Sequence, residues 1–308
     1  MDFWHWYQTA QNQAQAHHIP SHELDWLVFS CTDLDKLALR LRHRLPTDWQ
    51  HLPALWQLRL DQRQPVQYLA GQTIWRDLQL NVAPGVLIPR PETELIIDVA
   101  ISRIAELAPQ NPKVNYAAGD WADLGTGSGA IAIALARQLP QSQIHAVDCS
   151  DQALAIAQLN ANHNSVPNVR FYQGHWFEPL SLFQQTGLGT EPRATNSRAL
   201  VAMIANPPYI PTAEVMTLEP EVRDHEPHLA LDGGTDGLRD IRHLIATAPE
   251  YLATGALWLV EHRSEQGAAI AMMLEQSGVY EQVMIHHDLS GWDRFVSAVY
   301  VGNLSRFL

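Results

Sequence analysis

The chain has 308 residues, of which 46% are apolar, and its formal net charge at neutral pH is −13. This length suffices for a full α/β core and a second, smaller domain, whereas the short apolar runs exclude a membrane-spanning helix. Residues 1–90 hold eight basic and eight acidic residues, but residues 91–308 hold 12 basic and 25 acidic ones. Since phosphate contacts dominate binding to nucleic acids, we expect no stable nucleic-acid partner.

The start of the chain gives no sign of export. Met1–His5 lacks a basic segment followed by a long apolar one, so we expect no signal peptide. The only cysteines, Cys31 and Cys149, fall in different predicted domains, which is typical of a reducing compartment and not of a disulfide framework. We therefore expect a cytoplasmic protein without a membrane anchor, and we take it to be a monomer.

Three parts follow one another along the chain. Residues 1–64 are rich in leucine, tryptophan and alanine at helical spacing, with breaks such as Pro46–Asp48, and predict a bundle of about four or five helices. Residues 65–90 contain short apolar runs that predict a hairpin connector. Residues 91–308 predict the main α/β domain.

In the main domain, apolar runs that predict strands alternate with stretches that predict helices, which indicates a mostly parallel sheet. The predicted strands are Trp121–Leu124, Ile144–Val147, Val169–Tyr172, Val201–Ala205, Ala256–Val260 and Arg294–Val301. The predicted helices are Ile131–Leu139, residues 151–163, Thr235–Leu252 and Ser264–Gln276. Residues 184–199 are polar and rich in turn formers, which predicts a mobile surface loop.

A glycine-rich turn joins the first of these strands to the helix that follows it. The turn consists of Gly125, Thr126, Gly127, Ser128 and Gly129. Glycines let the backbone approach a ligand, and a helix start offers free N–H groups to an anion. Asp148 ends the next strand, so its carboxylate is expected at the same sheet edge, where it can bind a ribose. The spacing also fits dinucleotide-binding proteins, so the turn predicts a nucleoside cofactor without identifying it.

The most informative residues are Asn206, Pro207, Pro208 and Tyr209, which directly follow the strand Val201–Ala205. The two prolines remove two backbone donors and leave carbonyl groups free to accept hydrogen bonds. Asn206 adds a short amide, and Tyr209 adds an aromatic face with a polar tip. Together they form a rigid cup suited to a planar amino or amide group. The alternative is a turn that proline stiffens for packing alone.

The glycine turn, Asp148 and Asn206–Tyr209 each follow a parallel strand, so all three are expected at one edge of the sheet. This layout resembles the class I S-adenosylmethionine-dependent methyltransferases that act on amino or amide nitrogen. In such a protein the helix start at Ser128 receives the carboxylate of the methyl donor. A non-catalytic or NAD-binding Rossmann-like protein would share the fold and is the alternative from another functional class.

Further motifs make the resemblance more specific. In chain order they are Leu87–Glu94, Asp123–Ala130, His175–Phe177, Asn206–Tyr209 and the stretch from Glu219 to Gly237. From about Gln64 to Val301 the chain resembles the HemK/PrmC family, the N5-glutamine methyltransferases of peptide chain release factors. The helical N-terminal part matches that family in kind and position more than in motif.

The resemblance implies a Rossmann-like, mostly parallel seven-stranded sheet and an N-terminal helical domain that recognises the substrate. It implies S-adenosylmethionine as the cofactor, bound by Gly125–Gly129, Asp148, Trp176 and Asn206. It also implies class-1 release factors as partners, with the glutamine of their Gly-Gly-Gln loop held by Asn206–Tyr209. The family often has an acid where this chain has His175, whose neutral imidazole accepts a hydrogen bond in only one tautomer.

The chemistry of an amide acceptor gives these residues roles. An amide nitrogen is a poor nucleophile, because its lone pair is delocalised into the carbonyl group. Asn206 Oδ1 and the Pro207 carbonyl can each accept an amide hydrogen, which orients the nitrogen and stabilises positive charge growing on it. Tyr209 would form one wall. We therefore expect Asn206, Pro207 and Tyr209 to be catalytic, and we require no general base.

Two other acceptors belong to the same chemical class: a glutamine of a ribosomal protein, and an amino group of a nucleic-acid base. The acidic charge after residue 90 disfavours the base. A metal site at Asp224–His228 is not expected either, because Pro227 breaks the helix that would align the ligands.

Overall fold

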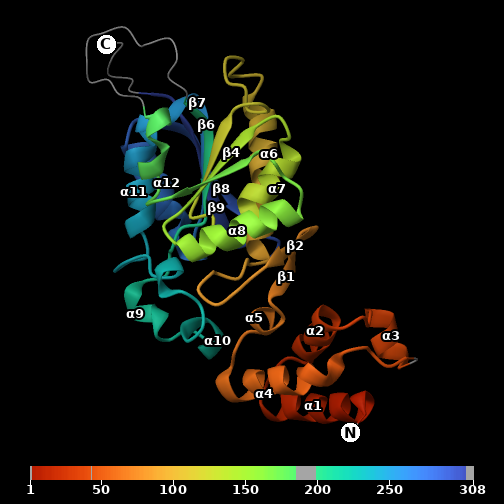
Figure 1. Ribbon diagram of the computed structural model, residues 1–308. Helices are drawn as coiled ribbons and strands as arrows, with labels where there is room; N and C mark the ends of the chain where they lie inside the picture. The colour runs from red at the N-terminus through yellow and green to blue at the C-terminus, as the bar shows by residue number, and fades with distance from the viewer. Residues whose placement is uncertain (1, 43, 185–198, 303–308) are drawn as a thin grey trace, which may run out of the picture.

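The computed structural model describes residues 2–42, 44–184 and 199–302. Figure 1 shows a small group of helices at the N-terminal end and, above it, a larger part built around a sheet. The surface loop predicted for residues 184–199 lies outside the described residues except at its two ends.

The N-terminal helices pack around an aromatic core. They are α1 (Phe3–Ala16), α2 (Ser21–Cys31), α3 (Lys36–Leu41) and α4 (Leu52–Gln62). Asp2 caps α1, because its Oδ1 accepts a hydrogen bond from His5 N at 2.9 Å. Phe3 and Trp56 are each 1% exposed, so the bundle buries large rings of its own and does not depend on the sheet for a core.

A short connector follows the bundle. It contains α5 (Val66–Ala70) and the antiparallel strands β1 (Gln72–Trp75) and β2 (Leu78–Asn81). Trp75 is buried and its indole N–H donates to the Arg90 carbonyl at 2.8 Å. This bond ties the hairpin to the segment that leads into α6 (Leu95–Leu107) and so fixes one wall of the cavity described below.

The larger part contains, within the described residues, a seven-stranded sheet in the order β5-β4-β3-β6-β7-β9-β8. Its strands are β3 (Asp120–Leu124), β4 (Gln143–Asp148), β5 (Val169–Gln173), β6 (Leu200–Ala205), β7 (Leu252–Glu261), β8 (Tyr280–His287) and β9 (Asp293–Tyr300). The five strands from β5 to β7 pair in parallel, whereas β9 pairs antiparallel with β7 and β8. The predicted mostly parallel, Rossmann-like sheet is confirmed.

Helices cover both faces of the sheet (Figure 1). One layer consists of α6, α7 (Ala130–Gln138) and α8 (Asp151–His163), and the other of α11 (Arg239–Thr247) and α12 (Gly267–Gln276). All six residues of β6 are buried, as expected for a central strand covered on both faces. The carboxyl end of β6 therefore delivers Asn206 from the buried centre of the sheet.

In the C-terminal third one strand was not predicted and one predicted helix was too long. The strand β8 was not predicted, because it is an edge strand whose residues, exposed or half-exposed except for Tyr280, lack a continuous apolar run. The helix predicted for Thr235–Leu252 is shorter, since α11 covers only Arg239–Thr247 and Leu252 already belongs to β7. Pro249 explains the early end, because proline has no N–H to continue the helix.

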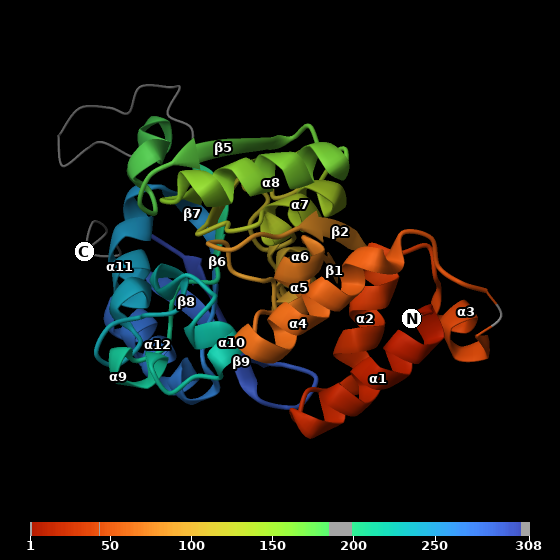
Figure 2. The ribbon, with the colours of Figure 1, turned by 60° about the horizontal axis from the view of Figure 1, so that its bottom comes forward.

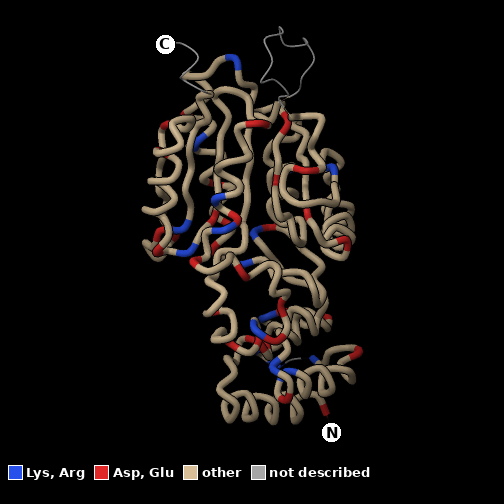
Figure 3. The backbone as a smooth tube through the Cα atoms, turned by 90° about the vertical axis from the view of Figure 1, so that its left-hand side faces the viewer, with Lys and Arg blue, Asp and Glu red and all other residues tan. Residues whose placement is uncertain are grey.

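The bundle contacts the larger part through charged groups. The short helices α9 (Thr212–Val215) and α10 (Pro220–Arg223) follow the Asn-Pro-Pro-Tyr turn, and α10 lies beside α4 (Figures 1 and 2). The Arg59 side chain, 2% exposed, binds Glu23 of α2 at 2.7 Å and Glu221 of α10 at 2.7 Å. In Figure 3 basic and acidic residues occur together at this junction. The bundle is thus tied to the chain segment that follows the Asn206–Tyr209 turn.

Candidate active site

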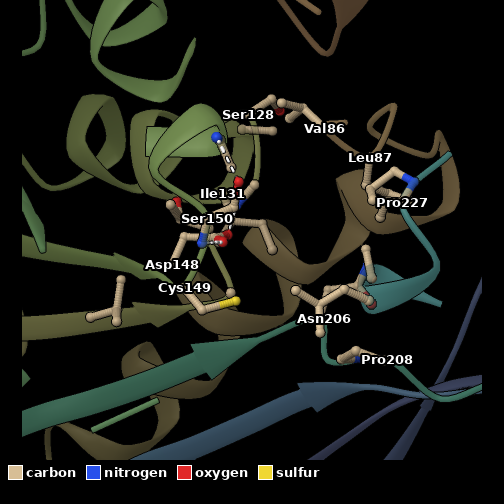
Figure 4. Close-up of a pocket in the computed structure, with 18 of the residues that line it drawn as sticks. Val86, Leu87, Ser128, Ile131, Asp148, Cys149, Ser150, Asn206, Pro208 and Pro227 are labelled. Carbon is tan, nitrogen blue, oxygen red and sulfur yellow. Dashed lines mark hydrogen bonds between the residues drawn. The ribbon is translucent and has the colours of Figure 1, made fainter. Parts of the chain in front are cut away.

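A cavity opens at the carboxyl ends of the parallel strands. Figure 4 shows Asp148, Cys149 and Ser150 on one side of it and Asn206, Pro208 and Pro227 on the other. The connector supplies a further wall through Val86, Leu87 and Arg90. Strand ends far apart in the sequence therefore meet at one edge, as the topology of an open parallel sheet requires.

The glycine turn lines the cavity on the side of Asp148. Gly125 and Gly127 adopt positive φ angles of 76° and 55°, which other residues rarely adopt. A Cβ on Gly125 would lie 3.4 Å from the Trp176 ring, so the absence of a side chain keeps the space between turn and ring open. Gly129 also has a positive φ, but it packs against Ala157 of α8 and does not line the cavity.

Asp123 holds this turn from below. Its Oδ2 accepts hydrogen bonds from Thr126 Oγ1 at 2.6 Å and from Ala132 N at 3.0 Å. The carboxyl group is fully buried, and burial raises the pKa of Asp123 to about 7 against the pull of these two hydrogen bonds. Asp123 therefore positions the turn and does not face a ligand.

Asp148 is oriented by the backbone on both sides. Its Oδ2 accepts from Gly127 N at 2.8 Å, and its Oδ1 accepts from Ser150 N at 2.9 Å. A carboxylate has about four lone-pair sites, so two hydroxyl groups can still donate to the oxygens. The side chain lines the cavity at the end of β4, where a ribose-binding acid was predicted.

Trp176 and His175 line the cavity next to the glycine turn. The ring of Trp176 lies over Gly125, and Trp176 itself has a left-handed backbone with a φ of 51°. Such a conformation is uncommon for a bulky residue and turns the indole toward the cavity. His175 is exposed, and its backbone N–H donates to Glu178 at 3.3 Å.

The turn Asn206–Tyr209, called the acceptor turn because it is predicted to hold the methyl acceptor, is anchored by residues in the protein interior. Asn206 lines the cavity, and its Nδ2 donates to Thr93 Oγ1 at 3.2 Å, which leaves Oδ1 as the side-chain oxygen available to a ligand. Pro208 lines the cavity too, whereas Pro207 is buried. The Tyr209 hydroxyl donates to Glu261 Oε1 at 3.3 Å and so points into the protein and not into the cavity.

An ion pair between a partly exposed arginine and a buried carboxylate lies on the acceptor side of the cavity. Arg90 Nη2 contacts Glu226 Oε1 at 2.8 Å, and the Glu226 side chain is 1% exposed. Burial raises the pKa of Glu226, although Arg90 favours its charged form. The pair joins the connector to the segment after α10, next to Pro227 on the cavity wall.

The structure thus brings together most of the residues predicted from the sequence. Gly125–Ser128, Asp148, Trp176, Asn206 and Pro208 line one cavity, whereas Gly129, Pro207 and Tyr209 stand outside its lining. Sequence reasoning placed Arg90, Thr93 and Glu226 in motifs of the family resemblance but gave them no role, and it did not single out Glu261. For Glu261 a signal existed, since it ends the apolar strand β7 just as Asp148 ends β4.

Two features are absent from the described residues. No group of three or more His, Cys, Asp or Glu side chains there is arranged to hold a metal ion. Among the same residues, every helix is too short or too polar to cross a membrane.

The fold and the cavity define a class I methyltransferase, and comparisons with known proteins agree. A family described as "Methyltransferase domain" matches residues 120–188. The crystal structure of the hMettl16 catalytic domain in complex with a MAT2A 3'UTR hairpin has a TM-score of 0.52, covers 91% of each chain and is 14% identical, so it supports the fold alone.

Two curated relatives are similar along nearly their whole length. The release factor glutamine methyltransferase of Synechocystis sp. is 47% identical over 304 residues, which is 96% of each chain. That of Thermosynechococcus vestitus is 43% identical over 302 residues, again 96% of each chain. The chain belongs to the release factor glutamine methyltransferase family and is a methyltransferase, which confirms the resemblance found in the sequence and sets aside the NAD-binding alternative.

Proposed function

We propose that this enzyme transfers a methyl group from S-adenosylmethionine to N5 of the glutamine in the Gly-Gly-Gln loop of class-1 release factors. The main support is similarity over 96% of the chain to enzymes named for this activity, joined to a cavity where Asp148 and Asn206 face each other. On this proposal the enzyme acts as a cytoplasmic monomer without a stable nucleic-acid partner.

The donor side fits S-adenosylmethionine. The first turn of α7 leaves N–H groups without helical acceptors, which suits the carboxylate of the donor. Asp148 keeps lone pairs for the ribose hydroxyls, and the Trp176 ring offers a face for adenine. We therefore assign donor binding to Gly125–Gly129, Asp148, Trp176 and Asn206, with Gly129 acting through packing.

When bound, S-adenosylmethionine supplies a methyl group on a sulfonium sulfur, whose carbon–sulfur bond breaks as the bond to the glutamine nitrogen forms. On this proposal Asn206 Oδ1, in the cavity lining, and the backbone carbonyl of Pro207, between the lining residues Asn206 and Pro208, accept the two amide hydrogens and aim the nitrogen. The same acceptors stabilise the positive charge on that nitrogen until its proton leaves to water. Tyr209 supports the turn from behind through Glu261.

The helical bundle carries a surface suited to a protein partner. Helix α3 exposes Leu37 and Leu41, which are 62% and 61% exposed and lie one helical turn apart. Lys36 and Arg40 flank them and form no ion pair within the described residues. Exposed apolar side chains with a basic rim favour an acidic protein surface, so we assign release-factor docking to this face of the bundle.

The decisive test is a transfer assay with the purified enzyme, S-adenosylmethionine and an intact release factor, read by peptide mass spectrometry. We expect one added methyl group on the Gly-Gly-Gln peptide and none on a release factor whose loop glutamine is replaced by asparagine. Methylation of ribosomal protein or RNA in parallel reactions, with none on the release factor, would show that the acceptor is wrong.

A further inference from the structure

A buried carboxylate lies directly behind the acceptor turn. Glu261 ends β7 and is 1% exposed. Its Oε1 accepts the hydrogen bond from the Tyr209 hydroxyl at 3.3 Å, while its Oε2 is buried without a hydrogen-bond partner within the described residues. An acid in this state is costly to keep unless the site uses its charge, so Glu261 calls for a functional explanation.

Glu261 reaches both side chains of the acceptor turn. It contacts Tyr209 directly, and the Thr93 hydroxyl, which favours the charged form of Glu261, also accepts the Asn206 Nδ2–H at 3.2 Å. Glu261, at the end of the neighbouring strand β7, therefore holds both Asn206 and Tyr209 from the interior. Asn206 Oδ1 stays directed to the cavity because its Nδ2 is fixed on Thr93.

Charged groups from two other segments face Glu261. Arg294 of β9 attracts its charge, and Glu92, in the turn before α6, repels it. Arg294 is already bonded to Asp288 at 3.0 Å, and Glu261 forms no ion pair of its own in the described part of the chain. Burial accordingly raises the pKa of Glu261 to about 7, despite Arg294, Thr93 and Tyr209.

We propose that Glu261 is a positioning residue for the methyl transfer, which rests on the function proposed above. Its carboxylate holds Tyr209 and, through Thr93, Asn206, and its negative charge stabilises the positive charge that grows on the acceptor nitrogen. The charge acts from a buried position, where it is screened far less than in water. Glu261 touches neither donor nor acceptor.

The test compares Glu261→Gln with the wild-type enzyme, because glutamine keeps an oxygen for the Tyr209 hydroxyl and removes the charge, with an amide NH2 in place of the second oxygen. At pH 8 and saturating donor we expect kcat for release-factor methylation to fall at least about tenfold. The dissociation constant of S-adenosylmethionine and the KM for the release factor should change less than about twofold. An unchanged kcat would overturn the proposal.

The pH profile of kcat separates charge from packing. The wild-type kcat should rise as the pH rises through about 7, where Glu261 becomes charged, and the Glu261→Gln profile should be flat there. Asp123→Asn is the matched control, because Asp123 is the other buried carboxyl group with a pKa of about 7. The inflection should persist in Asp123→Asn; its persistence in Glu261→Gln would contradict the proposal.

Thermal unfolding distinguishes the two roles, because a positioning role predicts that Glu261→Gln raises the melting temperature, whereas a purely structural role predicts that it lowers it. Since the folded-state pKa of Glu261 is raised, the protonated group stabilises the fold and this contribution is lost as the pH rises toward 7. Glu261→Gln should therefore melt at a higher temperature than wild type at pH 8 while being slower. Loss of both stability and activity would assign Glu261 to packing alone. Wild-type enzyme that fails to methylate the release factor would instead refute the proposed function.

Discussion

The two sides of the cavity are built differently. On the donor side the anchoring contacts are short in sequence: Asp123 to Thr126 spans three residues and Gly127 to Asp148 spans 21. On the acceptor side, Tyr209 to Glu261 spans 52 residues, Asn206 to Thr93 spans 113 and Arg90 to Glu226 spans 136. The donor side is thus a local motif, whereas the acceptor side exists only once distant segments have met.

This difference has energetic consequences. Closing a long loop costs more conformational entropy than closing a short one, although the cost grows only with the logarithm of its length. The acceptor contacts also involve two buried carboxyl groups, those of Glu226 and Glu261. The contribution of each to stability depends on neighbours from several elements. We therefore expect substitutions on the donor side to act on donor affinity and those on the acceptor side to act on turnover.

The largest effect is expected on the acceptor side, for Asn206→Ala. Loss of its Oδ1 removes an acceptor aimed at the reacting amide, so kcat should fall by about 10²–10³. Because Asn206 is half-buried, the free energy of unfolding should change by less than about 1 kcal/mol. Steady-state kinetics and urea denaturation measure the two quantities, and a near-normal kcat would remove Asn206 from the catalytic role.

The matching change on the donor side is Asp148→Ala. Each charged hydrogen bond to a ribose hydroxyl contributes roughly 1.5–3 kcal/mol, so donor affinity should fall at least about tenfold. Calorimetry with S-adenosylmethionine tests this, and Asp151→Ala, an exposed acid in the first turn of α8, serves as the control. An unchanged dissociation constant for Asp148→Ala would break the division between the two sides.

A smaller effect is expected outside the cavity, for the double substitution Leu37→Ser and Leu41→Ser on α3. If α3 docks the release factor, the KM for the intact protein should rise about tenfold, which corresponds to about 1.4 kcal/mol. Donor affinity and activity on a short Gly-Gly-Gln peptide should not change. The exposed pair Met272→Ser and Met284→Ser on the sheet domain is the control. Equal KM values for all three enzymes would disprove docking on α3.

The smallest expected effect concerns stability, for Asp123→Asn. The raised folded-state pKa of Asp123, about 7, means that its stabilising contribution is present in acid and is lost as the pH rises toward 7. The free energy of unfolding of the wild-type protein should therefore fall between about pH 4 and pH 7. In Asp123→Asn this total fall should be smaller by at least about 1 kcal/mol. Denaturation at several pH values measures it, and parallel curves would mean that Asp123 is charged throughout.

The sequence by itself determined the elements whose signals are local. The glycine turn, Asp148 and the Asn-Pro-Pro-Tyr motif each follow an apolar strand, and parallel pairing is enough to bring such strand ends to one edge. The resemblance to the family rests on these motifs in their order, and the seven-stranded class I methyltransferase fold is what that resemblance implies. Strand β8 escaped prediction because an edge strand shows little periodicity.

Only the tertiary structure decided how the acceptor turn is supported. In the sequence, Thr93 is part of the Leu87–Glu94 motif and Glu261 directly follows the predicted strand Ala256–Val260. Neither position reveals its burial or its partners, because these are not local properties. Folding places Thr93 against Asn206 and Glu261 against Tyr209, and burial then raises the pKa of Glu261. The sequence thus specified which chemical groups reach the sheet edge. Packing between distant segments determined which of them face the cavity, because desolvation depends on everything that surrounds a group and not on its neighbours in the chain.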